Sequence, residues 1–195
     1  GTQPTLPTPQ GEAPVADGAG TPDITVTPLD QPSPDGIGLL SPAVTGLPPD
    51  LWAGSPTATL TALIGAQDTD TLPALQDLIV TLMLAEAQAP LDAGADGALF
   101  LARVDKLLDM GALDPAQALL EAADTGSPQI FRRWFDVSLL TGTEAPACRT
   151  MVSRPGLAPT YPARVFCLAR EGEWGAAALT LGTARALGEI GDEDD

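Results

Sequence analysis

The chain has 195 residues, of which 44% are apolar and only 4% aromatic, and its 26 acidic and 9 basic residues give a net charge of −17. So few aromatic residues favour a core of Ala, Leu and Val in closely packed helices over a β-sandwich. The acidic balance argues against nucleic acid as a partner, because phosphate is bound by clustered Lys and Arg. Direct membrane insertion is not expected either, since no apolar run reaches the ~20 residues of a membrane-spanning helix.

Residues 1–50 hold eleven of the twenty prolines and no basic residue. Such a segment cannot bury enough apolar surface to offset the entropy of ordering it. We therefore expect a disordered, acidic, Pro/Thr/Gly-rich arm over residues 1–50, a helical domain over 51–190 and an acidic tail over 191–195. Leu39, Leu40, Leu51 and Trp52 form a sparse apolar strip, which either is a docking motif or packs on the first helix as a cap.

A first helical hairpin is expected before Pro90. Its first helix starts at Ser55-Pro56, a pair typical of helix starts, and ends near Gly65. Thr71 is expected to cap the second helix. This helix has the strongest amphipathic pattern in the chain, because its apolar residues fall at positions i, i+3, i+4, i+7 and i+8. These residues are Leu75, Leu78, Ile79, Leu82 and Met83.

A repeated pattern occupies the stretch from Gly97 to Leu187. Gly111, Gly142 and Gly172 lie 31 and 30 residues apart, and each is followed five positions later by an alanine. Self-similarity at this period predicts helical hairpins that bury their apolar faces against one another. Each of the three glycines is expected to end the first helix of its hairpin in a left-handed conformation.

The repeats resemble tetratricopeptide-type helical repeats. The segment that carries the resemblance is Gly172-Glu173-Trp174-Gly175-Ala176-Ala177, with small residues where two helices would touch. The resemblance implies an all-α fold, a right-handed stack of antiparallel helical hairpins that forms a solenoid behind the disordered arm. It also implies a scaffold that holds other proteins along a concave face.

Catalytic chemistry is not expected. The chain has no histidine, which removes the Ser-His-Asp and Cys-His arrangements and imidazole metal sites. The carboxylate pairs Asp68/Asp70 and Asp92/Asp96 fall in polar breaks, where turn formation or helix capping is the expected role. We predict no catalytic, metal-binding or cofactor-binding residue and no cofactor.

Cys148 and Cys167 are the only two cysteines. Cys148 is placed on the second helix of the middle repeat and Cys167 on the first helix of the next, so antiparallel neighbours would bring them side by side. We predict a disulfide, and with it an oxidising compartment such as a bacterial periplasm. The alternative is two buried thiols that pack as small hydrophobes.

Two candidate partner-binding clusters stand out. In the first, Arg132 and Arg133 precede Trp134 and Phe135; one ring could face outward with the arginines as a binding hot spot, or both could be core. In the second, Leu181 and Leu187 lie on the last helix, where an apolar face has no further repeat to cover it.

The sequence thus predicts a non-enzymatic periplasmic scaffold or adaptor that mediates protein–protein interaction in a bacterial envelope assembly, in motility, secretion or envelope biogenesis. The chain begins without Met, which we interpret as removal of a signal peptide. The alternative is an accessory helical domain of a larger envelope enzyme whose catalytic part lies outside this chain.

Overall fold

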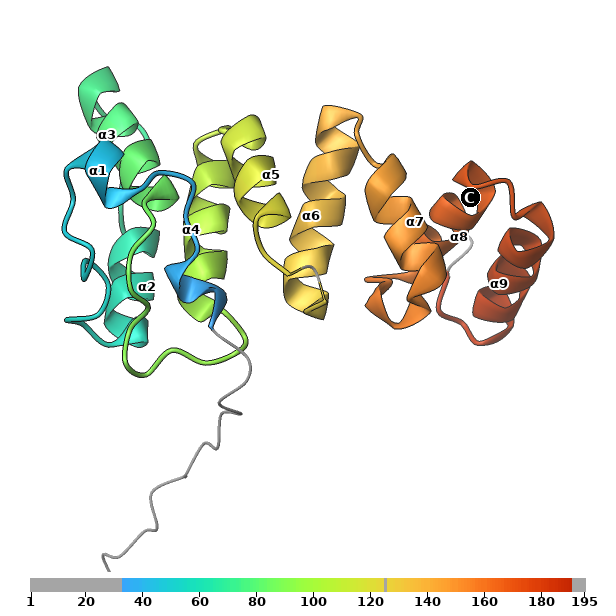
Figure 1. The fold of residues 1–195 in the computed structure, drawn as a ribbon. Coiled ribbons are helices and arrows are strands. Elements are labelled where there is room, and N and C mark those ends of the chain that lie inside the picture. The colour runs from blue at the N-terminus through green and yellow to red at the C-terminus, as the bar shows by residue number, and fades with distance from the viewer. Residues whose placement is uncertain (1–32, 125, 191–195) are drawn as a thin grey trace, which may run out of the picture.

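The structure is a computed structural model, and it describes residues 33–124 and 126–190. Over these residues the chain is all-α, as predicted, with no β-strand beyond one isolated bridge between Leu40 and Ala85 (Figure 1). The α-helices are α1 (Pro42–Thr45), α2 (Thr57–Gly65), α3 (Pro73–Leu84), α4 (Ala98–Asp109), α5 (Leu113–Glu121), α6 (Pro128–Thr141), α7 (Ala145–Ser153), α8 (Tyr161–Arg170) and α9 (Trp174–Ala186). Two 3₁₀ turns, η1 (Pro34–Gly36) and η2 (Pro155–Leu157), complete the set.

The helices from α4 onward follow one another across the molecule. Each packs on the next helix in the chain, from α4 on α5 through to α8 on α9, and Figure 1 shows them as a row. At the other end α2, α3 and η1 pack on α4. The buried core is therefore elongated and runs along this row, with Leu107, Leu119, Phe131 and Met151 among its fully buried side chains.

The three glycines of the repeat end helices as predicted. Gly111, Gly142 and Gly172 follow α4, α6 and α8, with φ angles of 69°, 72° and 83°. A side chain disfavours this left-handed conformation, which satisfies the last carbonyl groups of a helix by turning the chain back. The glycine spacing thus fixes where the first helix of each repeat stops.

The prediction of a disordered arm up to residue 50 is wrong for residues 33–50, which are ordered on the helical body, whereas residues 1–32 lie outside the described residues. Asp35 is buried, and its Oδ1 accepts a hydrogen bond from the backbone N–H of Phe100 at 2.8 Å. It therefore caps the start of α4, where Gly97 has no side chain to do so. Burial raises the pKa of Asp35. The segment is ordered despite its composition because polar bonds add to the packing of Ile37 and Leu40 against the core.

Arg103 on α4 is the centre of those polar bonds. The side chain is fully buried, and burial lowers its pKa to about 10. Its guanidinium also lies over the Trp52 ring, 5.5 Å from the ring centroid, a cation–π arrangement. One side chain thus binds the N-terminal segment, the end of α3 and α4 together. The acceptors of its hydrogen bonds are the carbonyl oxygens of Met83 (2.8 Å), Ala85 (2.9 Å), Ile37 (2.7 Å) and Asp35 (3.2 Å).

The segment around Gly38 runs against the end of α3. A Cβ atom at Gly38 would lie 2.2 Å from the backbone nitrogen of Glu86, so only glycine permits this approach. The N–H of Leu40 donates to Leu84 at 3.0 Å, and the N–H of Glu86 donates back to Leu40 at 2.9 Å. Leu40 of the predicted apolar strip therefore lies against the end of α3, and Trp52 of the same strip lies against Arg103 on α4.

The first hairpin departs from its prediction in two ways. The N-cap residues of α2 and α3 are Pro56 and Leu72, so neither Ser55 nor Thr71 caps a helix. The apolar face of α3 is also uncovered in its N-terminal half, where Leu75 and Leu78 are exposed, whereas Ile79, Leu82 and Met83 pack in or against the core. Among the described helices, none is both long and apolar enough to cross a bilayer.

Candidate protein-interaction surfaces

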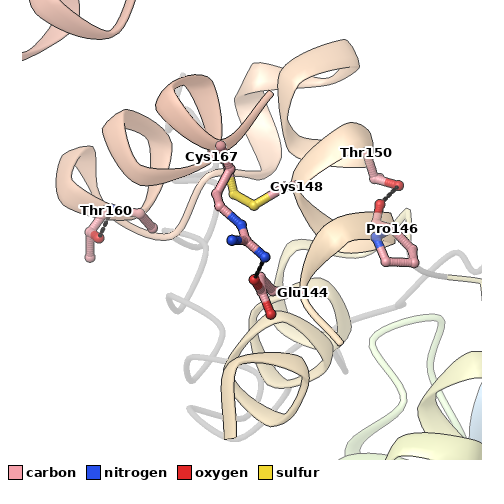
Figure 2. The surroundings of a disulfide bond; sticks show 8 residues. Glu144, Pro146, Cys148, Thr150, Thr160 and Cys167 are labelled. Carbon is pink, nitrogen blue, oxygen red and sulfur yellow. Dashed lines mark hydrogen bonds and ion pairs between the residues drawn. A yellow bond between two sulfur atoms is a disulfide. The ribbon is translucent and has the colours of Figure 1, made fainter. Parts of the chain in front are cut away.

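The predicted disulfide is confirmed. The Sγ atoms of Cys148 on α7 and Cys167 on α8 are 2.05 Å apart, their Cα atoms are 4.8 Å apart, and both residues are fully buried (Figure 2). In the chain-entropy model, closing a loop of this length stabilises the fold by about 3 kcal/mol. The bond joins the second helix of one repeat to the first helix of the next, so it fixes the position of α8 relative to α7.

An ion pair supports the same junction. Glu144, just before α7, accepts from the guanidinium of Arg170 at the end of α8, and its side chain is nearly buried. Figure 2 shows Glu144 close to the disulfide. Thr160 caps the start of α8 by accepting from the N–H of Ala163 at 3.2 Å. The ion pair of Arg170 fixes the C-terminal end of α8, and the cap by Thr160 fixes its N-terminal end.

The arginine and aromatic cluster on α6 divides into an inner and an outer part. Trp134 and Phe135 are both buried, so of the two alternatives the one in which both rings belong to the core is correct. Trp134 packs edge-on against Phe131, with ring centroids 5.9 Å apart and planes at 74°. The physical reason is helical spacing: Trp134 lies three residues after Phe131 and therefore on the same core-facing side.

Arg133 holds α6 to α4. Its Nε and Nη2 atoms donate to the two carboxylate oxygens of Asp105, at 2.6 and 2.7 Å. This bidentate geometry is the favoured one for Arg and a carboxylate, and it raises the pKa of Arg133. The side chain is thereby committed within the chain, so Arg133 is better described as a structural link between repeats than as a partner-binding group.

Arg132 is the arginine that faces outward. Its side chain is 63% exposed, and its contact with Asp136 one turn later is long, at 3.9 Å. An exposed pair at this distance contributes little to stability. Partial burial raises the pKa of Asp136, while Arg132 and Arg133 oppose that change. Arg132 is therefore available to a partner in a way that Arg133 is not.

A groove lies between α6 and α8, next to Arg132. It has a volume of about 440 Å³. Two of its apolar side chains, Leu139 and Phe166, are 41% and 40% exposed, which is high for residues of their size. Sequence reasoning did not find this groove, because Leu139 and Phe166 look like core residues until the two helices are placed side by side. Its lining includes Arg132, Phe135, Asp136, Leu139, Pro162 and Phe166.

The loop that leads into α8 forms further depressions. Residues Pro155–Pro162 contribute to an open hollow of about 620 Å³ with Arg164 and Glu189, and to another of about 370 Å³ with Arg132 and Arg133. Both are open, and the second adjoins the groove at Arg132 and Pro159.

The last helix has the uncovered face that the sequence predicted. Leu187 is 64% exposed and Leu179 73%, whereas Leu181 is half-buried and Ala184 is fully buried. α9 is thus covered on its α8 side alone. Of the two leucines predicted to bind a partner, Leu187 is accessible and Leu181 contributes in part to the packing.

The carboxylates in the polar breaks serve as local hydrogen-bond acceptors. Asp92 accepts from both the N–H and the hydroxyl of Thr57, at 3.0 and 2.9 Å, and these bonds lower the pKa of Asp92. Asp68 accepts from the N–H of Asp70 at 2.9 Å. Within the described residues no group of three His, Cys, Asp or Glu side chains is placed to hold a metal ion.

Comparison with known proteins gives no relative from which a function could be transferred. No family model matches the chain, and neither the curated proteins nor the solved structures contain a match. What the molecule does has therefore to be inferred from its own surfaces.

Proposed function

We propose that this protein is a non-enzymatic scaffold or adaptor that binds other proteins along a right-handed, tetratricopeptide-like solenoid. The observation that carries the proposal is the row of helices from α4 to α9, each packed on its neighbour in the chain. Such an arrangement gives a large surface for a modest number of residues, which suits extended partners. The uncovered apolar side chains along it supply the affinity that a binding surface needs.

The groove between α6 and α8 is the proposed primary site. Helices α6 and α8 are the first helices of successive repeats, so their exposed sides form one continuous surface. Leu139 and Phe166 offer apolar contacts, and Arg132 at the edge offers a charged donor. Arginine beside exposed apolar residues is a frequent composition of binding hot spots. The ligand that fits is an extended segment of a partner with an apolar side chain and a nearby carboxylate.

The proposed location is the bacterial periplasm, within an envelope assembly. The buried Cys148–Cys167 bond supports an oxidising compartment, because reducing compartments keep thiols free. The high acidic charge favours proteins over nucleic acid or anionic lipid as partners. Motility, secretion and envelope biogenesis are the processes in which such an adaptor would act.

A pair of adjacent leucines tests the groove. Leu139 lines it, whereas Leu140, which is 70% exposed, is absent from its lining. Full-length protein, its L139D variant and its L140D variant are each used as bait in extracts of the native organism. The proposal predicts a partner retained by the wild type and by L140D and lost with L139D. Equal recovery with all three baits, or recovery with none, would count against it.

A further inference from the structure

Helix α3 presents an apolar stripe to solvent. Leu72, Leu75 and Leu78 are 71%, 48% and 56% exposed, and they follow one another at intervals of three residues along one side of the helix. The C-terminal half of α3 is anchored, with Met83 and Leu84 buried and Ile79, Val80 and Leu82 packed against the core. Figure 1 shows α3 at the edge of the molecule, away from the groove between α6 and α8. The N-terminal half of α3 therefore leaves its leucines uncovered. The prediction that this helix has the strongest amphipathic pattern in the chain is wrong, because apolar and polar residues are separated more clearly on α4 and α6.

The charges around this stripe are of one sign. Asp68 and Asp70 precede α3, Asp77 lies on it, and all three are exposed or half-exposed. No Lys or Arg occurs anywhere in residues 1–102. The two bases of α4 that contact this part of the chain, Arg103 and Lys106, are buried and donate to backbone carbonyl oxygens, so neither offers positive charge at the surface. The stripe is an apolar strip bordered by negative charge.

From these two observations we propose that the α3 stripe, Leu72, Leu75 and Leu78, binds a cationic amphipathic helix of a partner protein. A helix with apolar residues at i, i+3, i+4 and i+7 matches leucines at the same spacing, and Lys or Arg on its flanks would face the aspartates. A second copy of this chain is disfavoured as the occupant, because its net charge of −17 repels a like surface. An anionic bilayer is disfavoured for the same reason.

This inference rests on the proposed role in protein binding but uses a different surface from the α6–α8 groove. The two can therefore fail separately. Substitutions on α3 leave Leu139 and Phe166 untouched, and the L139D variant leaves the α3 stripe untouched.

The test uses a synthetic helical peptide with leucines at every third and fourth position and lysines on both flanks, labelled for fluorescence anisotropy. A second peptide has glutamates in place of the lysines. The full chain is compared with L75S/L78S and with a matched control, L179S/L187S, which removes two still more exposed leucines, one on α9 and one at its C-cap. Circular dichroism checks that each variant remains folded.

The expected result is that the lysine peptide binds the wild type and the α9 variant alike and binds L75S/L78S at least about tenfold more weakly. Binding should weaken when the salt is raised to roughly 0.5 M, and D70N/D77N should reduce that salt dependence. Amide protection on binding should be confined to α3 and its flanks.

Four results would overturn the proposal. Equal binding by L75S/L78S and by the α9 control would show a non-specific apolar contact, and equal binding of the two peptides would remove the charge argument. Failure of the lysine peptide to bind the wild type would remove the site itself. A dimer in sedimentation that L75S/L78S abolishes would make a second copy the occupant. If the lysine peptide did not bind α3 while a partner protein was still retained by the wild type and lost with L139D, the α3 proposal would fail and the groove proposal would remain.

Discussion

The Nε atom of Arg103 donates a 2.8 Å hydrogen bond to the carbonyl oxygen of Met83, at the point where α3 ends against α4. The rest of the guanidinium binds carbonyl oxygens of Asp35, Ile37 and Ala85, so one buried cation holds two separate segments of backbone, residues 35–37 and 83–85, to α4. Carbonyl groups buried in this way need a donor, because an unpaired one keeps its full desolvation cost.

The first prediction concerns this residue. Arg103→Met should lower the free energy of unfolding by about 3 kcal/mol or more, since it leaves several buried carbonyl groups without a donor. Arg103→Lys should recover only part of the loss, because an ammonium group cannot reach all four acceptors. Urea denaturation measures both. Arg132→Met is the matched control, and its exposed ion pair should change stability by less than about 0.5 kcal/mol. Equal unfolding midpoints for Arg103→Met and Arg132→Met would show that the hydrogen bonds of Arg103 do not stabilise the fold.

The second prediction concerns the disulfide. Replacing Cys148 and Cys167 together with alanine should lower the free energy of unfolding by about 3 kcal/mol, because the open chain regains loop entropy in the unfolded state. Reduction of the wild type should have a similar effect on the urea midpoint, and the double variant should not respond to reductant. Mass spectrometry after alkylation provides the direct check. Two alkylated thiols in protein freshly isolated without reductant would contradict the bond and the periplasmic location.

The third prediction compares two glycines in different conformations. Gly142 has a φ of 72°, so Gly142→Ala should cost about 1 kcal/mol through backbone strain. Gly182 lies inside α9 with open space where a Cβ would stand, so Gly182→Ala should raise stability by up to about 1 kcal/mol. Thermal unfolding should therefore show shifts of opposite sign. Shifts of the same sign would mean that one of the two helix boundaries is misplaced.

The fourth prediction is a pH dependence. Hydrogen bonds from Thr57 lower the pKa of Asp92 in the folded state, so Asp92 stabilises the fold above its unfolded pKa of about 3.9 and loses that effect as the pH falls through the folded value. Asp92→Asn should consequently be less stable than the wild type at neutral pH, with the difference shrinking below about pH 4. Asp50→Asn is the control. A difference in the free energy of unfolding between Asp92→Asn and the wild type that stayed constant at all pH values would contradict the linkage.

Several features of the fold could be predicted because their cause is local. A glycine in left-handed conformation ends a helix whatever surrounds it, so Gly111, Gly142 and Gly172 marked the repeats correctly. Two cysteines on successive helices leave one possible pairing, and the structure forms it.

Other features depend on contacts that a linear pattern does not contain. The ordering of residues 33–37 depends in part on Arg103, more than 60 residues later, and no local pattern indicates that contact. The apolar face of α3 was correctly placed on one side of a helix, but periodicity does not say what covers that side. Likewise the groove between α6 and α8 is lined by Leu139 and Phe166, which lie 27 residues apart in the sequence on different repeats.

The central claim is that the side formed by α6 and α8 binds a protein partner, and cross-linking in intact cells tests it most directly. A photo-reactive amino acid is placed at Phe166 in the groove and, as a control, at Leu140 outside it. The account predicts a discrete adduct with one partner from position 166 that the L139D substitution removes, and no such adduct from position 140. Two results would contradict it: no adduct from position 166 although the protein is folded and correctly located, or the same adducts from both positions.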